Sequence, residues 1–218
     1  MRLPLPIVQS DAYGCEDACL LQALYLLGLA EPPQFEEIIR RINRPADWGN
    51  TDNGGLRVGL EFGAHYTQIS TFDNQQMAAD TSGEYLTSFL RNAKGASQEE
   101  IDAHMGTIHQ YLQIRAGHTL QIAETHAAQI TQLYRAATPH DLSMLLNLGG
   151  IVEMKIPEQT PEAGYRPPVL VFKIDESGMC GMYCPDDGGF YAHPIDDVAQ
   201  MIEHDLGCWS TAPLPIES

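Results

Sequence analysis

The chain has 218 residues, 44% of them hydrophobic, which is enough for one substantial core or at most two small lobes. Its formal net charge of −17 comes from 29 acidic and 12 basic residues, and the sequence has no stripe of basic residues. Such a chain repels phosphate backbones, so nucleic acid is not expected as a partner. No apolar run approaches the roughly 18 residues that a membrane-spanning helix needs, so no membrane span is expected.

The N-terminus and the cysteines indicate a cytoplasmic protein with reduced thiols. Met1–Pro6 holds one basic residue and two prolines, and no long apolar run follows, so it does not read as a secretory signal. The odd number of cysteines argues against a disulfide framework. No metal and no other cofactor is predicted, because no familiar zinc spacing is found in the set Cys180, Cys184, His193 and Cys208.

The first part of the chain is expected to be mainly helical. The apolar run Cys15–Leu27 predicts a buried helix that ends at Gly28. Ala46–Gly55 is rich in Gly, Asn and Asp and predicts a loop. Further elements are expected from hydrophobic periodicity, namely helices at Gln34–Ile42 and Leu56–Gly63 and a strand at Tyr66–Phe72.

Two capping patterns mark later helices. Ser97 and Glu100 form a capping box, which predicts a helix from Ser97 to about Arg115, before Gly117. Thr138 followed by Pro139 begins another helix. The expected strands are Gln129–Tyr134, Ile151–Ile156, Val169–Ile174 and Met179–Tyr183, with a turn at Asp175–Gly178, and a last helix is expected to start at His193–Pro194 and end before Gly207.

This order of elements predicts an α+β fold in a single domain, 1–218. Helices dominate up to about residue 150, and short β-rich segments occupy 151–218. We therefore expect a helical lobe, with the Cys-bearing helix at its centre, packed on a C-terminal antiparallel sheet.

Cys15 is the first candidate for chemistry, because it stands at the start of the predicted central helix. The N–H groups and the dipole of a helix N-terminus favour the thiolate, which is the nucleophilic form of cysteine. Gln9 lies six residues upstream and has a side-chain amide that can donate a hydrogen bond to an oxyanion. The alternative is that Cys15 is a small buried apolar side chain, which is the interpretation favoured for Cys19 one turn later.

The segment Gln9–Cys15, the helix after it and the strands Ile151–Ile156 and Val169–Ile174 resemble the papain-like cysteine peptidases. Within that clan the pattern is most similar to the bacterial leader-peptide-processing group. The resemblance implies a papain-like fold, with Cys15 as nucleophile and Gln9 in the oxyanion hole. It also implies a His at the start of a later strand and an Asp or Asn after the next one.

The sequence departs from this family at three positions. Pro168 stands where the family has its His, Cys184 stands where it has its Asp, and Glu16 replaces the Gly that usually follows the nucleophile. A thiol needs a proton acceptor nearby. His193, the one histidine of the predicted C-terminal sheet, is the substitute base among the candidate catalytic residues, and an N-cap or surface role is its alternative.

Two functions follow from these residues. The first is a thiol-dependent hydrolase or acyltransferase that acts on an amide or thioester of a peptide-like substrate. The second is a catalytically degenerate peptidase-like protein that binds a peptide or protein partner without cleaving it. A coincidental Gln–Cys spacing in another α+β protein is the third interpretation, and the sequence specifies no oligomeric state.

Overall fold

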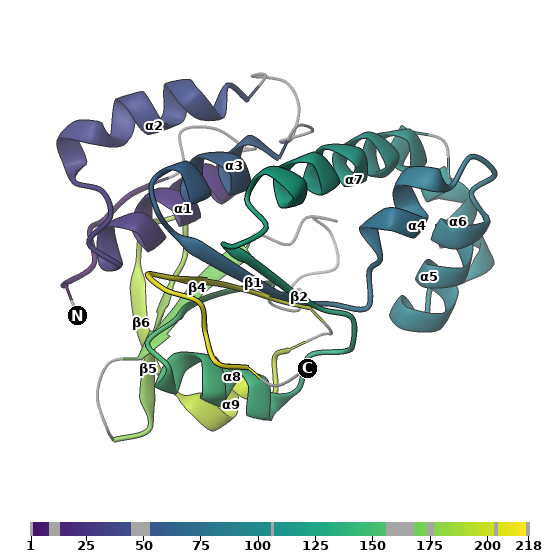
Figure 1. Cartoon of the computed structure of the whole chain (residues 1–218). Coiled ribbons are helices and arrows are strands. Elements are labelled where there is room, and N and C mark those ends of the chain that lie inside the picture. Colours follow the sequence, from purple (N-terminus) through teal and green to yellow (C-terminus); the bar gives the residue numbers. More distant parts are fainter. Residues whose placement is uncertain are drawn as a thin grey trace.

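A seven-stranded mixed sheet lies between two layers of helices (Figure 1). The computed structural model describes residues 2–8, 14–44, 53–105, 107–155, 168–173, 177–202 and 205–216. The strand order is β2-β1-β7-β3-β4-β5-β6, in which β1 and β2 run parallel and all other neighbours antiparallel. The strands are β1 (His65–Ile69), β2 (Ile130–Leu133), β3 (Ile151–Lys155), β4 (Pro168–Lys173), β5 (Met179–Tyr183), β6 (Phe190–Pro194) and β7 (Leu206–Ser210).

The predicted α+β class is confirmed, but the sheet draws on more of the chain than expected. β1 and β2 come from the first 150 residues, which were expected to be mainly helical. β7, near the C-terminal end, pairs with β1 on one side and β3 on the other. The last described strand therefore joins the early and late parts of the chain in one sheet.

Helices cover both faces of this sheet. α1, α2 and α3 pack with Ile151 and Trp209 on one face, whereas α8 and α9 pack with Val152 and Cys208 on the other. Successive residues of a strand point to opposite faces, so β3 and β7 each serve both cores. The helices are α1 (Cys15–Leu26), α2 (Phe35–Ile42), α3 (Gly54–Glu61), α4 (Asn74–Ala79), α5 (Glu84–Lys94), α6 (Gln98–Met105), α7 (Thr107–Thr125), α8 (Pro139–Asn147) and α9 (Ile195–Ala199).

Several predicted elements are confirmed within a few residues. α1 begins at Cys15 and ends before Gly28, whose φ of 75° is the left-handed conformation expected after a helix C-terminus. α2, α3, β1 and β2 occupy the predicted places. β4 and β5 pair antiparallel, as expected, while the predicted turn between them includes 174–176, which lie outside the described residues. Most of the predicted loop, namely residues 46–52, also lies outside them.

The predicted end of a helix before Gly117 is wrong. The segment forms two helices, α6 and α7, and α7 continues through Gly117 to Thr125. One glycine costs a helix only about 1 kcal/mol, which is too little to end a helix that packs on its neighbours. α7 packs against α4 and α6, and Ala116 lies in a small core with Met77 and Leu86.

The predicted last helix is also wrong at its start. His193 belongs to strand β6, and α9 begins at Ile195 with Pro194 as its N-cap. Proline fits the end of an edge strand, because it has no N–H to give to a ladder. β6, β7 and α4 were not predicted, since each has only five or six residues and shows no clear period. α5 was also missed, although Leu86 and Leu90 stand at helical spacing within its 11 residues.

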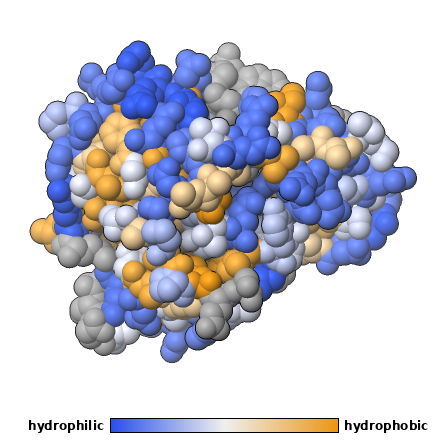
Figure 2. Space-filling model, in the orientation of Figure 1, coloured by the Kyte–Doolittle hydropathy of each residue, from blue (hydrophilic) through white to orange (hydrophobic). Residues whose placement is uncertain are grey.

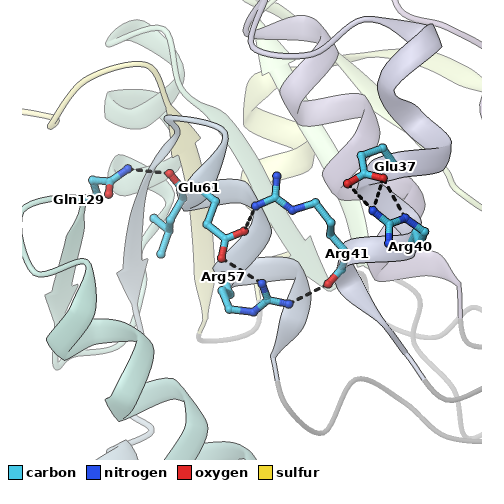
Figure 3. A network of polar contacts seen from close by, with 7 residues as sticks. Glu37, Arg40, Arg41, Arg57, Glu61 and Gln129 are labelled. Carbon is cyan, nitrogen blue, oxygen red and sulfur yellow. Dashed lines mark hydrogen bonds and ion pairs between the residues drawn. The ribbon is translucent and has the colours of Figure 1, made fainter.

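A polar network fixes α2 and α3 beside each other (Figure 3). Glu61 forms ion pairs with both Arg57, at 2.9 Å, and Arg41. Arg57 also donates to the backbone carbonyl of Arg41, at 2.7 Å, and Gln129 donates to the carbonyl of Leu60, at 2.9 Å. These contacts link α2, α3 and the start of β2, and so position α3 over Trp209.

The N-terminus of α8 carries the predicted cap. Thr138 Oγ1 accepts from the Asp141 N–H, and the Asp141 carboxylate accepts from the Thr138 N–H, at 2.8 Å, and from Arg135. These donors lower the pKa of Asp141 to about 2, with the bond from Arg135 contributing most. The carboxylate therefore stabilises the fold in its charged form.

Asp141→Asn should lower the free energy of unfolding by about 2 kcal/mol at neutral pH. The pKa of Asp141 in the folded protein is below its ordinary value of 3.8. The stabilisation by its carboxylate is therefore present above pH 3.8 and is lost as the pH falls toward 2. Urea unfolding of both proteins from neutral to acid pH checks this. A difference between the two proteins that does not shrink on acidification would contradict the assignment.

The surface over α5 and α6 is mainly hydrophilic (Figure 2), in keeping with the strong acidic charge. Among the described residues, no helix combines the length and the apolar character needed to cross a membrane.

Candidate functional site

A cavity of about 580 Å³ opens at the N-terminal end of α1. Its walls come from α1 and α7, and its floor comes from the neighbouring strands β1, β7 and β3. Cys15 lines it and is 5% exposed. Gly14 caps the helix with its backbone, so Cys15 is the first helical residue. The thiol therefore has the position that the sequence predicted, at a helix N-terminus and beside a space that can hold a ligand.

Gln9, the other half of the predicted pair, lies outside the described residues. The segment just before it is described and is held in place. The buried Tyr183 hydroxyl donates to the carbonyl of Ile7 at 2.6 Å. This bond fixes the chain two residues before Gln9 against β5.

The structure does not bring His193 and Cys15 together. His193 pairs with Cys180 across β5 and β6, and residues paired in this way share one face of a sheet. Cys180 packs in the core under α8 and α9, whereas α1 lies on the opposite face. No described histidine side chain lines the cavity of Cys15.

A charged group from α7 reaches the first turn of α1. Arg115 donates to the carboxylate of Glu16 at 3.2 Å and to the hydroxyl of Tyr111 at 3.1 Å. Glu16 is the main cause that raises the pKa of Arg115 above its ordinary value, so the guanidinium stays charged. Glu16 thus has a counter-ion, Arg115, next to Cys15.

Glu153 of β3 brings a carboxyl group into the floor of the cavity. Burial, reinforced by the charge of Glu16, raises its pKa to about 7. Trp209 Nε1, on the adjacent strand β7, donates to Glu153 Oε2 at 3.4 Å. A carboxyl group that titrates near neutral pH can both accept and release a proton under working conditions.

Tyr66 completes this part of the floor. Its ring lies 4.6 Å from that of Trp209, centroid to centroid. A Cβ on Gly207 would come within 2.2 Å of the Tyr66 hydroxyl, so the missing side chain at 207 leaves room for this group. Gly207 is the register partner of Glu153. Burial and the nearby charge of Glu153 raise the pKa of Tyr66 well above its ordinary value.

Pro168 and Cys184, where the sequence resemblance implies a His and an Asp, have other surroundings than a catalytic pair would need. Pro168 begins β4, and its carbonyl oxygen accepts a bond from the Cys19 thiol at 3.5 Å. Cys184 follows β5 and is half-buried. Burial raises the pKa of both the Cys19 and the Cys184 thiols. Cys19 is fully buried, as the sequence indicated.

Sequence reasoning missed Glu153, Tyr66 and Arg115. A signal for Glu153 was present, because it is the acidic residue in Ile151-Val152-Glu153-Met154-Lys155 and shares a face with Ile151. A carboxylate on the inward side of an apolar strand is expensive and indicates function. Arg115 and Tyr66 gave no such signal, since their places depend on the packing of α7 and on the pairing of β1 with β7.

Comparison with known proteins finds no matching family model, no matching curated protein and no matching solved structure. Within the part of the chain that the structure describes, no group of three or more His, Cys, Asp or Glu side chains could hold a metal ion.

Proposed function

We propose that the chain has a papain-like fold and is a thiol-dependent hydrolase or acyltransferase, with Cys15 as its nucleophile. The observation that carries this proposal is the position of Cys15, the first residue of α1 and part of the wall of the 580 Å³ cavity. The helix N-terminus favours the thiolate, and in the proposed mechanism the Cys15 backbone N–H, in the first turn, acts as an oxyanion donor. Gln9 would supply the second donor, as the family resemblance implies.

The lining of the cavity fits an amide or thioester within a peptide-like substrate. Aromatic side chains such as Tyr66, Trp209 and Phe89 offer apolar contact area, while Gln68 and Asn53 offer amides for backbone groups. The net charge of −17 favours the approach of basic peptides.

Cys15 should react with iodoacetamide at least about tenfold faster than the other thiols at neutral pH, because only a thiolate is a good nucleophile. The reference thiols are Cys19, in the core of the same helix, and Cys184, which is half-buried and lies away from the cavity. Peptide mapping by mass spectrometry after short exposure of the native protein measures the order of modification.

If Cys15 is modified no faster than Cys19, and only when the protein unfolds, the enzyme proposal is wrong. A library of peptidyl-coumarin amides supplies the second measurement. Coumarin release should disappear in Cys15→Ala and persist in Cys184→Ser, the matched loss of a thiol outside the cavity.

The second candidate function is a peptidase-like protein that binds a peptide or protein and does not cleave it. The sequence favours it where it departs from the resemblance, because Pro168 and Cys184 stand where the resemblance implies a catalytic His and Asp. Under this alternative, Cys15→Ala should bind a peptide ligand as tightly as the natural chain, and no member of the coumarin library should be turned over. Retained binding without turnover in both proteins would select this second function.

A further inference from the structure

We propose that Glu153 is the proton acceptor for the Cys15 thiol and takes the part that a histidine has in the papain-like family. This inference rests on the proposed function of Cys15. It adds a catalytic residue from β3, an element that contributes neither the nucleophile nor the oxyanion donors.

The placement of Glu153 supports this role. Glu153 and Cys15 line the same cavity, one from the floor and the other from the wall. α1 packs on both β3 and β4, and the Cys19 thiol reaches Pro168, the register partner of Lys155. Lys155 and Glu153 are two residues apart and so share the face of β3 that α1 covers. One turn of α1, about 5.4 Å, separates Cys15 from Cys19.

The groups around Glu153 keep its carboxyl group in balance between its two protonation states. Glu16 on α1 opposes its ionisation, whereas Arg115 on α7 and Lys155 on β3 favour it. Tyr66 on β1 and Cys19 on α1 carry no charge near neutral pH, because burial raises the pKa of each. Asp205 also lines the cavity and accepts a bond from Ser70 at 2.7 Å.

The indole of Trp209 orients this carboxyl group. Its N–H donates to Glu153 Oε2, and Oε1 is the second oxygen of the same carboxyl group that can take up a proton. Trp209 is itself fixed, being 4% exposed and in contact with the ring of Tyr66. The arrangement matches a nucleophile, a base and a group that holds the base.

The proposed reaction has an acylation stage and a hydrolysis stage. The Cys15 thiol gives its proton to the Glu153 carboxylate while sulfur bonds to the substrate carbonyl carbon. The C–N bond of the amide breaks, and the proton on Glu153 moves to the leaving amine, which leaves the acyl group on Cys15 as a thioester. Water next attacks the thioester and gives a proton to Glu153, which returns it to the departing Cys15 sulfur as the carboxylic acid leaves.

The test is the pH dependence of iodoacetamide alkylation of Cys15 in a Cys184→Ser background. The natural residue should give a rise in rate near pH 7, where Glu153 ionises. In Glu153→Gln this rise should disappear, and alkylation should slow about a hundredfold at neutral pH, the lower end of what a general base contributes. Glu153→Asp should restore part of the rise.

The direction of the change in the alkylation rate of Cys15 distinguishes a general base from a carboxylate that acts only through its charge. If Glu153 were only a negative charge, removing it would favour the thiolate and make alkylation faster, and that result would overturn the inference. Glu16→Gln is the matched control, since it removes a charge from the same cavity but leaves the carboxyl group of Glu153; the rise should remain and should move to lower pH, because Glu16 opposes the ionisation of Glu153. An unreactive Cys15 in the natural chain would instead defeat the proposed function itself.

Discussion

Glu153→Gln should make the folded protein more stable near pH 8, by about 3 kcal/mol, and should change its stability little near pH 4.5. The pKa of Glu153 is about 7 when folded and 4.5 ordinarily. The folded state therefore binds more protons than the unfolded state between these values, so the natural chain loses stability as the pH rises through this range. Glutamine has no charge to bury, and its oxygen still accepts the bond from Trp209.

Urea unfolding of both proteins at several pH values from 4.5 to 8 measures this effect, and the difference between the proteins at each pH is the quantity of interest. The other ionisable groups are the same in both chains, so their pH dependence cancels in the difference. Asp141→Asn is the contrasting variant, because it should destabilise at neutral pH and approach the natural chain in acid. A Glu153→Gln protein that is equally stable or less stable at pH 8 would show that the carboxyl group is not held at a cost.

A gain in stability of this size in Glu153→Gln would show that the natural carboxyl group lowers the stability of the fold at neutral pH. A group that lowers stability at neutral pH is retained when activity needs it, and active sites are the usual place for such groups. Glu153→Gln should therefore separate the two properties, giving a more stable protein whose Cys15 reacts more slowly. A purely structural carboxylate, such as that of Asp141, should show the opposite sign of stability change and no effect on Cys15.

The extent to which the sequence predicts this fold depends on how local each signal is. The cap at Thr138, the capping box at Ser97 and the apolar run of α1 are local, and all three are found in the structure. The place of β7 between β1 and β3 is not local, because it depends on pairing between residues more than 130 positions apart, such as Tyr66 with Trp209. Short strands of this kind have no periodic signal of their own.

The same distinction between local and long-range signals explains which residues of the candidate site could be predicted. Cys15 could be found because a helix N-terminus is encoded in its immediate neighbours. Glu153 and Arg115 could not be joined to it, since the floor of the cavity exists only after β1, β7 and β3 pair. His193 was chosen on its position in the chain, and the pleat of β6 places it on the other face of the sheet.

Alanine should have opposite effects at two glycines that both lie inside helices. Gly59, in α3, sits against Trp209, where a Cβ would come within 2.5 Å of the indole ring and 3.0 Å of Leu20 Cδ1. Both neighbours are buried, so the contact cannot be relieved at the surface. Gly59→Ala should cost about 3 kcal/mol, the upper part of the range for an overpacked core. At Gly117, in α7, a Cβ would meet nothing within 4 Å.

Gly117→Ala should therefore stabilise the protein by up to about 1 kcal/mol, because alanine loses less backbone entropy in a helix than glycine does. Urea unfolding at one pH compares the two variants with the natural chain, and the same substitution in both removes helix propensity as an explanation for a difference in sign. Tryptophan fluorescence in a Trp48→Phe background, in which Trp209 is the one remaining tryptophan, gives an independent reading, since only Gly59→Ala displaces this indole. Because Trp209 also donates to Glu153, Gly59→Ala should slow the alkylation of Cys15 as well, whereas Gly117→Ala should leave its rate unchanged. Equal changes in stability for Gly59→Ala and Gly117→Ala would mean that α3 is not closely packed against Trp209 in the floor of the cavity.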